Sequence, residues 1–158
     1  MSGEVYVAAS GSQLNASILD SLYKPMQTAP MNKLGWTADV DLRDGFPRDY
    51  LQADLVVVTD PVQTHLRPGS QEVVRYLVEQ TISQDSYLGR HFARVPVEFT
   101  LDNNVKVYLY HKISDFSFSD LEKLSEYFMS LYPQANELFE ERILESIYAT
   151  ESAKHREN

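Results

Sequence analysis

Short apolar runs alternate with turn-forming and helix-capping residues along the first half of the chain. Residues 5–9 predict a strand, and Ser12 is expected to cap a helix that ends at Pro25. The continuous β-branched run at 54–59 predicts a strand buried on both faces. A further helix is predicted after Pro68. This order favours an α/β fold, with a small mixed, mostly parallel sheet and helices on both faces.

The segment between the two strands has a less regular pattern. Residues 25–37 contain two prolines and a glycine, which predicts an irregular connection. The alternating residues 38–42 predict a short strand, and Pro47 is expected to open a brief helix through Leu51. These elements complete the predicted order between the first strand and the buried one.

A β-hairpin and two helices are predicted in the second half. Two apolar-rich runs, 95–101 and 105–111, flank an Asp-Asn-Asn turn and indicate a hairpin at one edge of the sheet. Ser119 and Glu122 have the spacing of a capping box, which predicts a helix that Pro133 closes.

The last predicted helix, 136–148, completes a C-terminal helix pair. The chain has 158 residues, which predicts one α/β domain over residues 1–148, and residues 149–158 are expected to form a flexible polar tail.

Composition excludes several classes of protein and site. The net charge of −9 argues against nucleic acid and against direct binding to an anionic membrane surface. Cysteine is absent, which excludes disulfides, thiol nucleophiles and zinc–thiolate sites. The four histidines, at 65, 91, 111 and 155, have no metal-ligand spacing, and no Ser/His/Asp triad can be placed. No cofactor and no metal are therefore predicted, and the residues indicate a binding or structural domain.

Two predicted strands end in polar residues where ligands of α/β sheets bind. Ser10 and Ser12 lie between the first strand and its helix, whose N-terminus could hold an anion, although a tight turn with an N-cap is the simpler interpretation. Asp60, Gln63 and His65 follow the buried strand and bring a carboxylate, an amide and an imidazole together. A turn-capping Asp60 and an exposed His65 are the alternative.

A third candidate is the charged cluster Asp41, Arg43 and Asp44. Asp39 and Asp41 would share one face of a strand and could hold a hard cation. The simpler interpretation is that Arg43 pairs with Asp41 or Asp44 and fixes a loop.

Two stretches resemble a known family. They are Asp-Leu-Arg-Asp-Gly-Phe-Pro at 41–47, continuing through 53–66, and Gly-Arg-His-Phe at 89–92 followed by 99–110. In their short sequence motifs and the order of these motifs, they resemble the soluble C-terminal region of bacterial membrane glycosyltransferases. The family is the protein mannosyltransferase and aminoarabinose transferase group, and the resemblance covers about residues 4–145.

That resemblance implies a fragment of a larger enzyme. Such enzymes use a polyprenyl-phosphate sugar donor at the outer face of the membrane, and their catalytic acidic residues lie in an early extracytoplasmic loop that this chain does not contain. The expected function is an accessory extramembranous domain, soluble and inactive by itself. Its expected partners are the transmembrane portion of the same protein and a glycan or protein acceptor. The alternatives are a free-standing domain that binds a nucleotide or sugar phosphate at Ser10–Ser12, and a structural or oligomerisation module.

Overall fold

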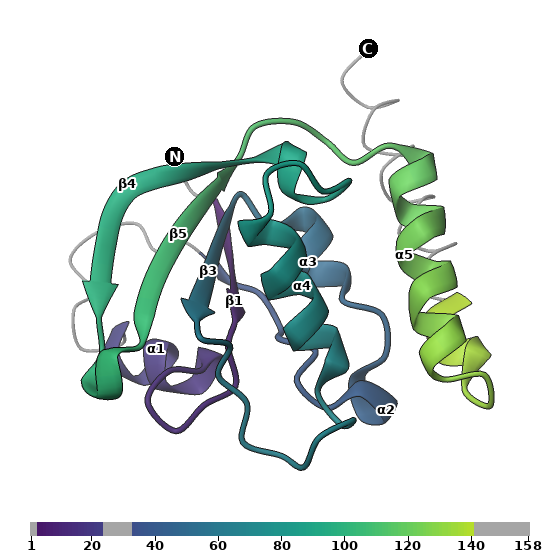
Figure 1. The fold of residues 1–158 in the computed structure, drawn as a ribbon, viewed down its shortest axis with the longest axis horizontal. Helices are drawn as coiled ribbons and strands as arrows, with labels where there is room; N and C mark the ends of the chain where they lie inside the picture. The colour runs from purple at the N-terminus through teal and green to yellow at the C-terminus, as the bar shows by residue number, and fades with distance from the viewer. Residues whose placement is uncertain (1–2, 24–32, 141–158) are drawn as a thin grey trace.

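The computed structural model describes residues 3–23 and 33–140, which form a five-stranded sheet in the order β2-β1-β3-β5-β4 (Figure 1). β1 pairs in parallel with β2 and β3, whereas β5 is antiparallel to both β3 and β4. The α/β fold is thus confirmed. The strands are β1 (Glu4–Ala8), β2 (Lys33–Leu34), β3 (Leu55–Asp60), β4 (Phe92–Thr100) and β5 (Lys106–Lys112).

The prediction of a mostly parallel sheet is wrong. The hairpin adds two antiparallel ladders at one edge of the sheet, and both are longer than the parallel pairing of β1 with the two-residue β2. The expected strand at 38–42 does not form, because Asp41–Asp44 folds into the one-turn helix α2. A backbone hydrogen bond from the Asp44 amide to the Val40 carbonyl begins this turn.

Alternation along β3 separates two apolar cores. Val56 and Val58 point to one side and are fully buried, while Val57 points to the other side and is buried as well. The predicted strand buried on both faces is therefore confirmed. The larger core includes Val74 of α4 (Glu72–Ile82), and the smaller one includes Leu19 of α1 (Ala16–Tyr23).

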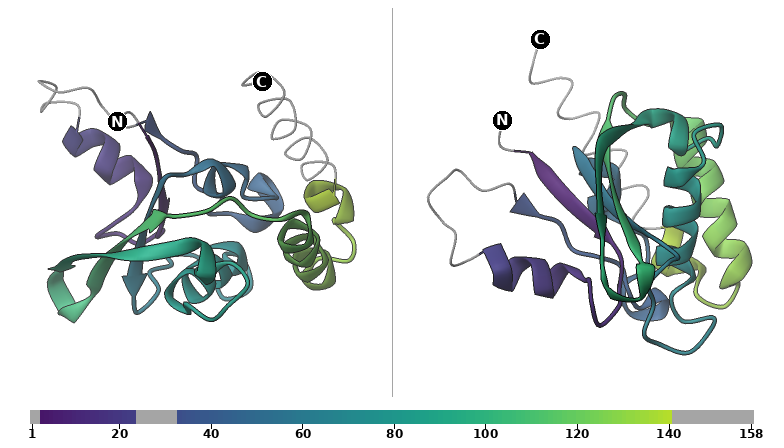
Figure 2. Two further views of the ribbon diagram at one scale, coloured as in Figure 1. Left: turned by 90° about the horizontal axis from the view of Figure 1, so that it is seen from above. Right: turned by 60° about the vertical axis from the view of Figure 1, so that its left-hand side comes forward.

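Helices cover both faces of the sheet, as predicted. Figure 2 shows α1 on one side, with α4 and α5 (Phe118–Leu131) on the other. The stacked rings of Tyr76 and Tyr127, 3.7 Å apart between centroids, join α4 to α5. The short helix α3 (Arg48–Gln52) follows Pro47 as expected and places Tyr50 edge-on against Tyr6 of β1.

Two helix starts differ from the predicted ones. The capping box of α5 consists of Ser117 and Asp120, two residues earlier than Ser119 and Glu122. The side chain of Asn15, rather than Ser12, accepts a hydrogen bond from a first-turn amide of α1. In both cases a neighbouring polar residue of similar capping ability occupies the N-cap.

Some predicted elements lie partly or wholly outside the described residues. Most of the irregular connection at 25–37 and the tail at 149–158 are outside them. Of the last predicted helix, residues 136–140 are helical and the rest is not described. Within the described ranges, no helix has both the length and the apolar character needed to cross a bilayer.

Candidate functional site

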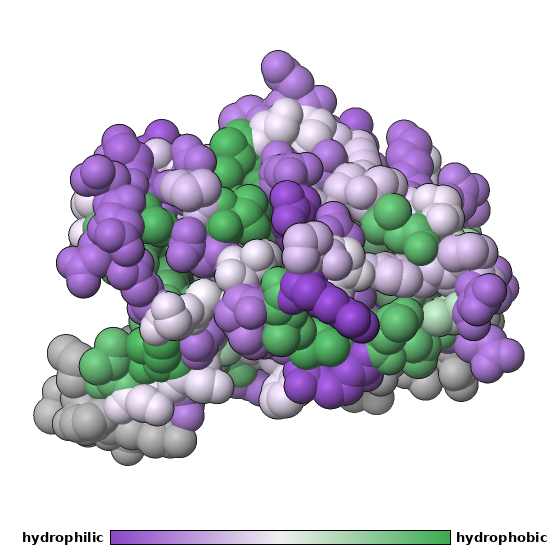
Figure 3. All heavy atoms as spheres, turned by 60° about the horizontal axis from the view of Figure 1, so that its bottom comes forward, coloured by the Kyte–Doolittle hydropathy of each residue, from purple (hydrophilic) through white to green (hydrophobic). Residues whose placement is uncertain are grey.

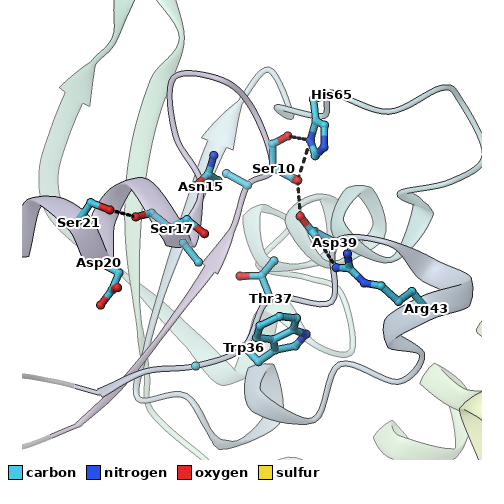
Figure 4. A pocket seen from close by; sticks show the side chains of 13 residues that line it. Ser10, Asn15, Ser17, Asp20, Ser21, Trp36, Thr37, Asp39, Arg43 and His65 are labelled. Carbon is cyan, nitrogen blue, oxygen red and sulfur yellow. Dashed lines mark hydrogen bonds and ion pairs between the residues drawn. The ribbon is translucent and has the colours of Figure 1, made fainter.

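A cleft of about 540 Å³ opens where β1 ends, between α1 and the segment 35–43 (Figure 4). We call it the Ser10 cleft. Most of its lining residues are polar, and they come from four separate stretches of the chain. Its polar lining residues include Ser10, Asn15, Asp20, Asp39, Arg43 and His65.

Ser10 lies between Asp39 and His65 in the wall of the cleft (Figure 4). Its Oγ donates a 2.8 Å hydrogen bond to Asp39 Oδ2 and lies 3.0 Å from His65 Nδ1. The same Nδ1 lies 2.5 Å from the Ser10 carbonyl oxygen. Because a carbonyl can only accept, the proton of the neutral imidazole is on Nδ1, and Nε2 carries a lone pair.

Arg43 connects Asp39 to a buried carboxylate. Its guanidinium donates at 2.8 Å to Asp39 and, through two nitrogens at 2.7 and 2.9 Å, to Asp44. Burial of the Asp44 carboxyl tends to raise its pKa. The Arg43 guanidinium and the amides of Val40 and Asp39 outweigh that effect and hold the pKa below its usual value. The predicted pairing of Arg43 is thus with Asp44 and not with Asp41.

The buried side chain of Gln71 fixes the loop that carries His65. Its Oε1 accepts 2.9 Å hydrogen bonds from the amides of His65 and Leu66, and its Nε2 donates to the Asp39 carbonyl at 2.8 Å. One amide thus fixes the backbones of two cleft residues that are far apart in the sequence. The cleft is consequently pre-formed rather than assembled from independent loops.

The turn before α1 has already used several of its donors. The amide of Ser10 donates to the Gln63 carbonyl, that of Gly11 to the Leu14 carbonyl, and that of Ile18 to Asn15 Oδ1. These bonds occupy three of the N–H groups on which a phosphate cradle at this turn would draw. The observed arrangement is the tight turn of the simpler interpretation, but with Asn15 rather than Ser12 as the cap of α1.

Five predicted site residues lie outside the lining of the Ser10 cleft, namely Ser12, Asp60, Gln63, Asp41 and Asp44. Ser12 is exposed in the turn, and Asp60 is exposed at the end of β3. Gln63 supports the cleft from behind, because its carbonyl accepts the Ser10 amide at 2.9 Å and its side chain packs against Gly11. Of the predicted group after β3, only His65 therefore lines the cleft.

Asp41 points away from the cleft and caps the N-terminus of α4, from which it is far apart in the sequence. Its buried carboxylate accepts from the amides of Glu72 and Val73 at 2.7 and 3.1 Å, and from the hydroxyl of Tyr132. Burial raises the pKa of Asp41, although these hydrogen bonds oppose the shift. The carboxylate of Asp41 therefore links α2 to α4 and to the end of α5, and it does not share a face with Asp39.

A second polar cluster surrounds the fully buried Asp120. Arg90 Nη2 and His91 Nε2 donate to its two oxygens at 2.7 and 3.1 Å, and Ser117 donates from its amide and its hydroxyl. Burial tends to raise the pKa of Asp120, but these donors lower it overall. Arg90 and His91 therefore form an internal connection to α5.

The aromatic residue of the cleft, Trp36, belongs to no motif of the sequence. Trp36 is the sole tryptophan of the chain, and its side chain is 66% exposed at the cleft. Asn15 and Asp20 were missed as well, because a polar residue in a predicted helix is more often solvated. An isolated tryptophan directly after Gly35, in a connection that also contains two prolines, was the available signal.

Chemically, the Ser10 cleft is suited to binding rather than to bond cleavage. The Ser10 hydroxyl donates to a carboxylate, and the nearest imidazole nitrogen is itself a donor, so it cannot accept the serine proton.

Comparisons with protein-family models, with curated proteins and with solved structures found no match.

Proposed function

We propose that this chain is a binding domain without bond-breaking machinery, the accessory extramembranous part of a lipid-linked-sugar membrane glycosyltransferase. The observation that carries the proposal is the orientation of Ser10, which donates to Asp39 while His65 presents a protonated Nδ1. This set holds a ligand-binding wall in place but supplies no activated nucleophile. The resemblance of the stretches at 41–66 and 89–110 supports the parentage.

Two experiments test this proposal. The isolated chain, incubated with polyprenyl-phosphate sugars and acceptor peptides or glycans, is expected to release no product above the rate without protein. Robust turnover would contradict the proposal. The genomic reading frame that encodes the chain tests the parentage, since several apolar helices in frame upstream of Gly3 support it and a stop codon there refutes it.

The alternative of phosphate binding at Ser10–Ser12 is less favoured by the geometry. The amides of Ser10 and Gly11 are already bonded to backbone carbonyls, and Ser12 does not line the cleft. The other alternative is a structural or oligomerisation module, which would need an apolar contact surface. Figure 3 looks onto the end of the molecule where β1 and β3 finish. The described hydrophobic side chains at that end form separate patches among hydrophilic ones.

A further inference from the structure

The residues that line the Ser10 cleft include hydrogen-bond acceptors with remaining capacity. Asp39 accepts one bond on each carboxylate oxygen, from Ser10 and from Arg43, and each oxygen retains further acceptor capacity. Nε2 of His65 carries a lone pair, and it forms no hydrogen bond within residues 3–23 and 33–140. A cleft rich in acceptors selects a ligand rich in donors.

The charges of the cleft oppose an anionic ligand. Among the described lining residues, Asp39 contributes a carboxylate beside Ser10 and Arg43 contributes a guanidinium. That guanidinium already donates to both Asp39 and Asp44. A fully ionised phosphate is negatively charged and has only acceptor oxygens, so the carboxylate would repel it and the acceptors of the cleft would find no donor on it. A hydroxyl group, by contrast, donates a hydrogen bond without carrying charge.

Trp36 adds a rigidly supported apolar surface. The Gly35 amide donates to the Val5 carbonyl at 2.8 Å, and the Thr37 hydroxyl donates to the Val7 carbonyl at 2.9 Å, so the segment is fixed along β1 on both sides of Trp36. The Trp36 amide donates to the carboxylate of Asp49. An exposed indole on a fixed backbone is a flat platform whose burial by a ligand requires little ordering.

From these three observations we infer that the Ser10 cleft binds the unphosphorylated ring of a saccharide. Its hydroxyl groups donate to Asp39 and to Nε2 of His65, and its C–H face packs on the indole of Trp36. This inference rests on the proposed function and narrows it, because it assigns the site to the glycan and not to the phosphate of a lipid-linked donor.

Fluorescence of Trp36 tests the inference directly, since no other tryptophan contributes. The full chain is titrated with methyl glycosides of common hexoses and pentoses and with short oligosaccharides. The same titration is made with inorganic phosphate and uridine diphosphate. A saturable change with at least one saccharide, at a Kd on the order of 1 mM, is expected, together with no saturation by the phosphates.

Variants followed by NMR titration locate the binding. Trp36→Ala is expected to weaken saccharide binding about tenfold, whereas Trp36→Phe retains an aromatic face and stays within about threefold of the original. Phe99→Ala is the matched control, because Phe99 is an exposed aromatic residue on β4 that does not line the cleft.

The other outcomes contradict the inference in distinguishable ways. Saturation by the phosphates alone would make the cleft an anion site, and no response to any saccharide up to about 50 mM would exclude the saccharide. An equal loss in Phe99→Ala would place the binding elsewhere. Turnover of lipid-linked sugar by the same preparation would instead overturn the proposed function, while leaving saccharide binding at Trp36 intact.

Discussion

Arg43 and Asp44 are adjacent in the sequence and form a two-pronged ion pair, with Nε and Nη2 of the arginine 2.7 and 2.9 Å from the two carboxylate oxygens. The Asp44 side chain is 5% exposed and also accepts the amides of Asp39 and Val40. This geometry makes Asp44 the anchor of the cleft wall that carries Asp39.

Asp44→Ala is expected to lower the free energy of unfolding by about 2 kcal/mol, because two backbone amides and the guanidinium lose a buried acceptor. Urea denaturation followed by circular dichroism measures the change. Asp60→Ala, at an exposed carboxylate, is the control and should change stability by less than about 0.5 kcal/mol. Equal effects of the two substitutions would show that Asp44 anchors nothing.

The pH dependence of stability should differ in sign between Asp44 and Asp41. The pKa of Asp44 is lowered on folding, so its contribution is present above the unfolded pKa of about 3.9 and is lost as the pH falls through the folded pKa. The pKa of Asp41 is raised, so stability is lost as the pH rises from about 3.9 through the folded pKa.

The damage caused by Asp44→Asn should therefore shrink as the pH falls below about 4, whereas the damage caused by Asp41→Asn should shrink as the pH rises above about 4. Urea denaturation of both variants and the original chain, at several pH values, measures the two trends. Parallel trends would contradict the opposite shifts.

Substitution of two serines near the start of α5 tests which of them, Ser117 or Ser119, is the N-cap. Ser117→Ala should cost about 1 kcal/mol of stability, because the Ser117 hydroxyl accepts the Asp120 amide and donates to the Asp120 carboxylate. Ser119→Ala makes the same chemical change inside the first turn and should cost less than about 0.5 kcal/mol. Thermal or urea unfolding of the two variants provides the comparison, and the reverse order would place the cap at Ser119.

His65 and His91 should show opposite neutral tautomers. His65 donates from Nδ1 to a backbone carbonyl, whereas His91 donates from Nε2 to the Asp120 carboxylate. Long-range ¹H–¹⁵N NMR of the imidazole rings identifies the protonated nitrogen in each. A proton on Nε2 of His65 would remove the acceptor on which saccharide binding at the cleft depends.

Gly89 and Gly69 should respond differently to alanine. A Cβ at Gly89 would lie 2.0 Å from the Ser83 carbonyl oxygen, so Gly89→Ala should destabilise the protein by about 3 kcal/mol. Gly69 has a φ of 84° and open space around it, so Gly69→Ala should cost only about 1 kcal/mol of backbone strain. Urea unfolding measures both, and similar costs would contradict the crowding at Gly89.

Local pattern was sufficient for most elements of the fold. The strand at β3, the hairpin of β4 and β5, and the helix α4 follow from β-branched runs, turn residues and helical spacing, which depend on near neighbours in the chain. The strand expected at 38–42 failed because alternation over five residues is weak, and the short helix that formed there brings Asp41 under the first turn of α4.

The sequence by itself determined that an α/β sheet would end in polar residues near Ser10 and His65. Only the tertiary structure decided which of those residues meet. Asp39 and Trp36 come to the Ser10 cleft, while Asp41 turns away to cap α4 and Asp60 stays at the surface. The physical reason is that the cleft depends on contacts between segments about 30 to 55 residues apart, such as Ser10 with Asp39 and with His65, and no local spacing encodes them.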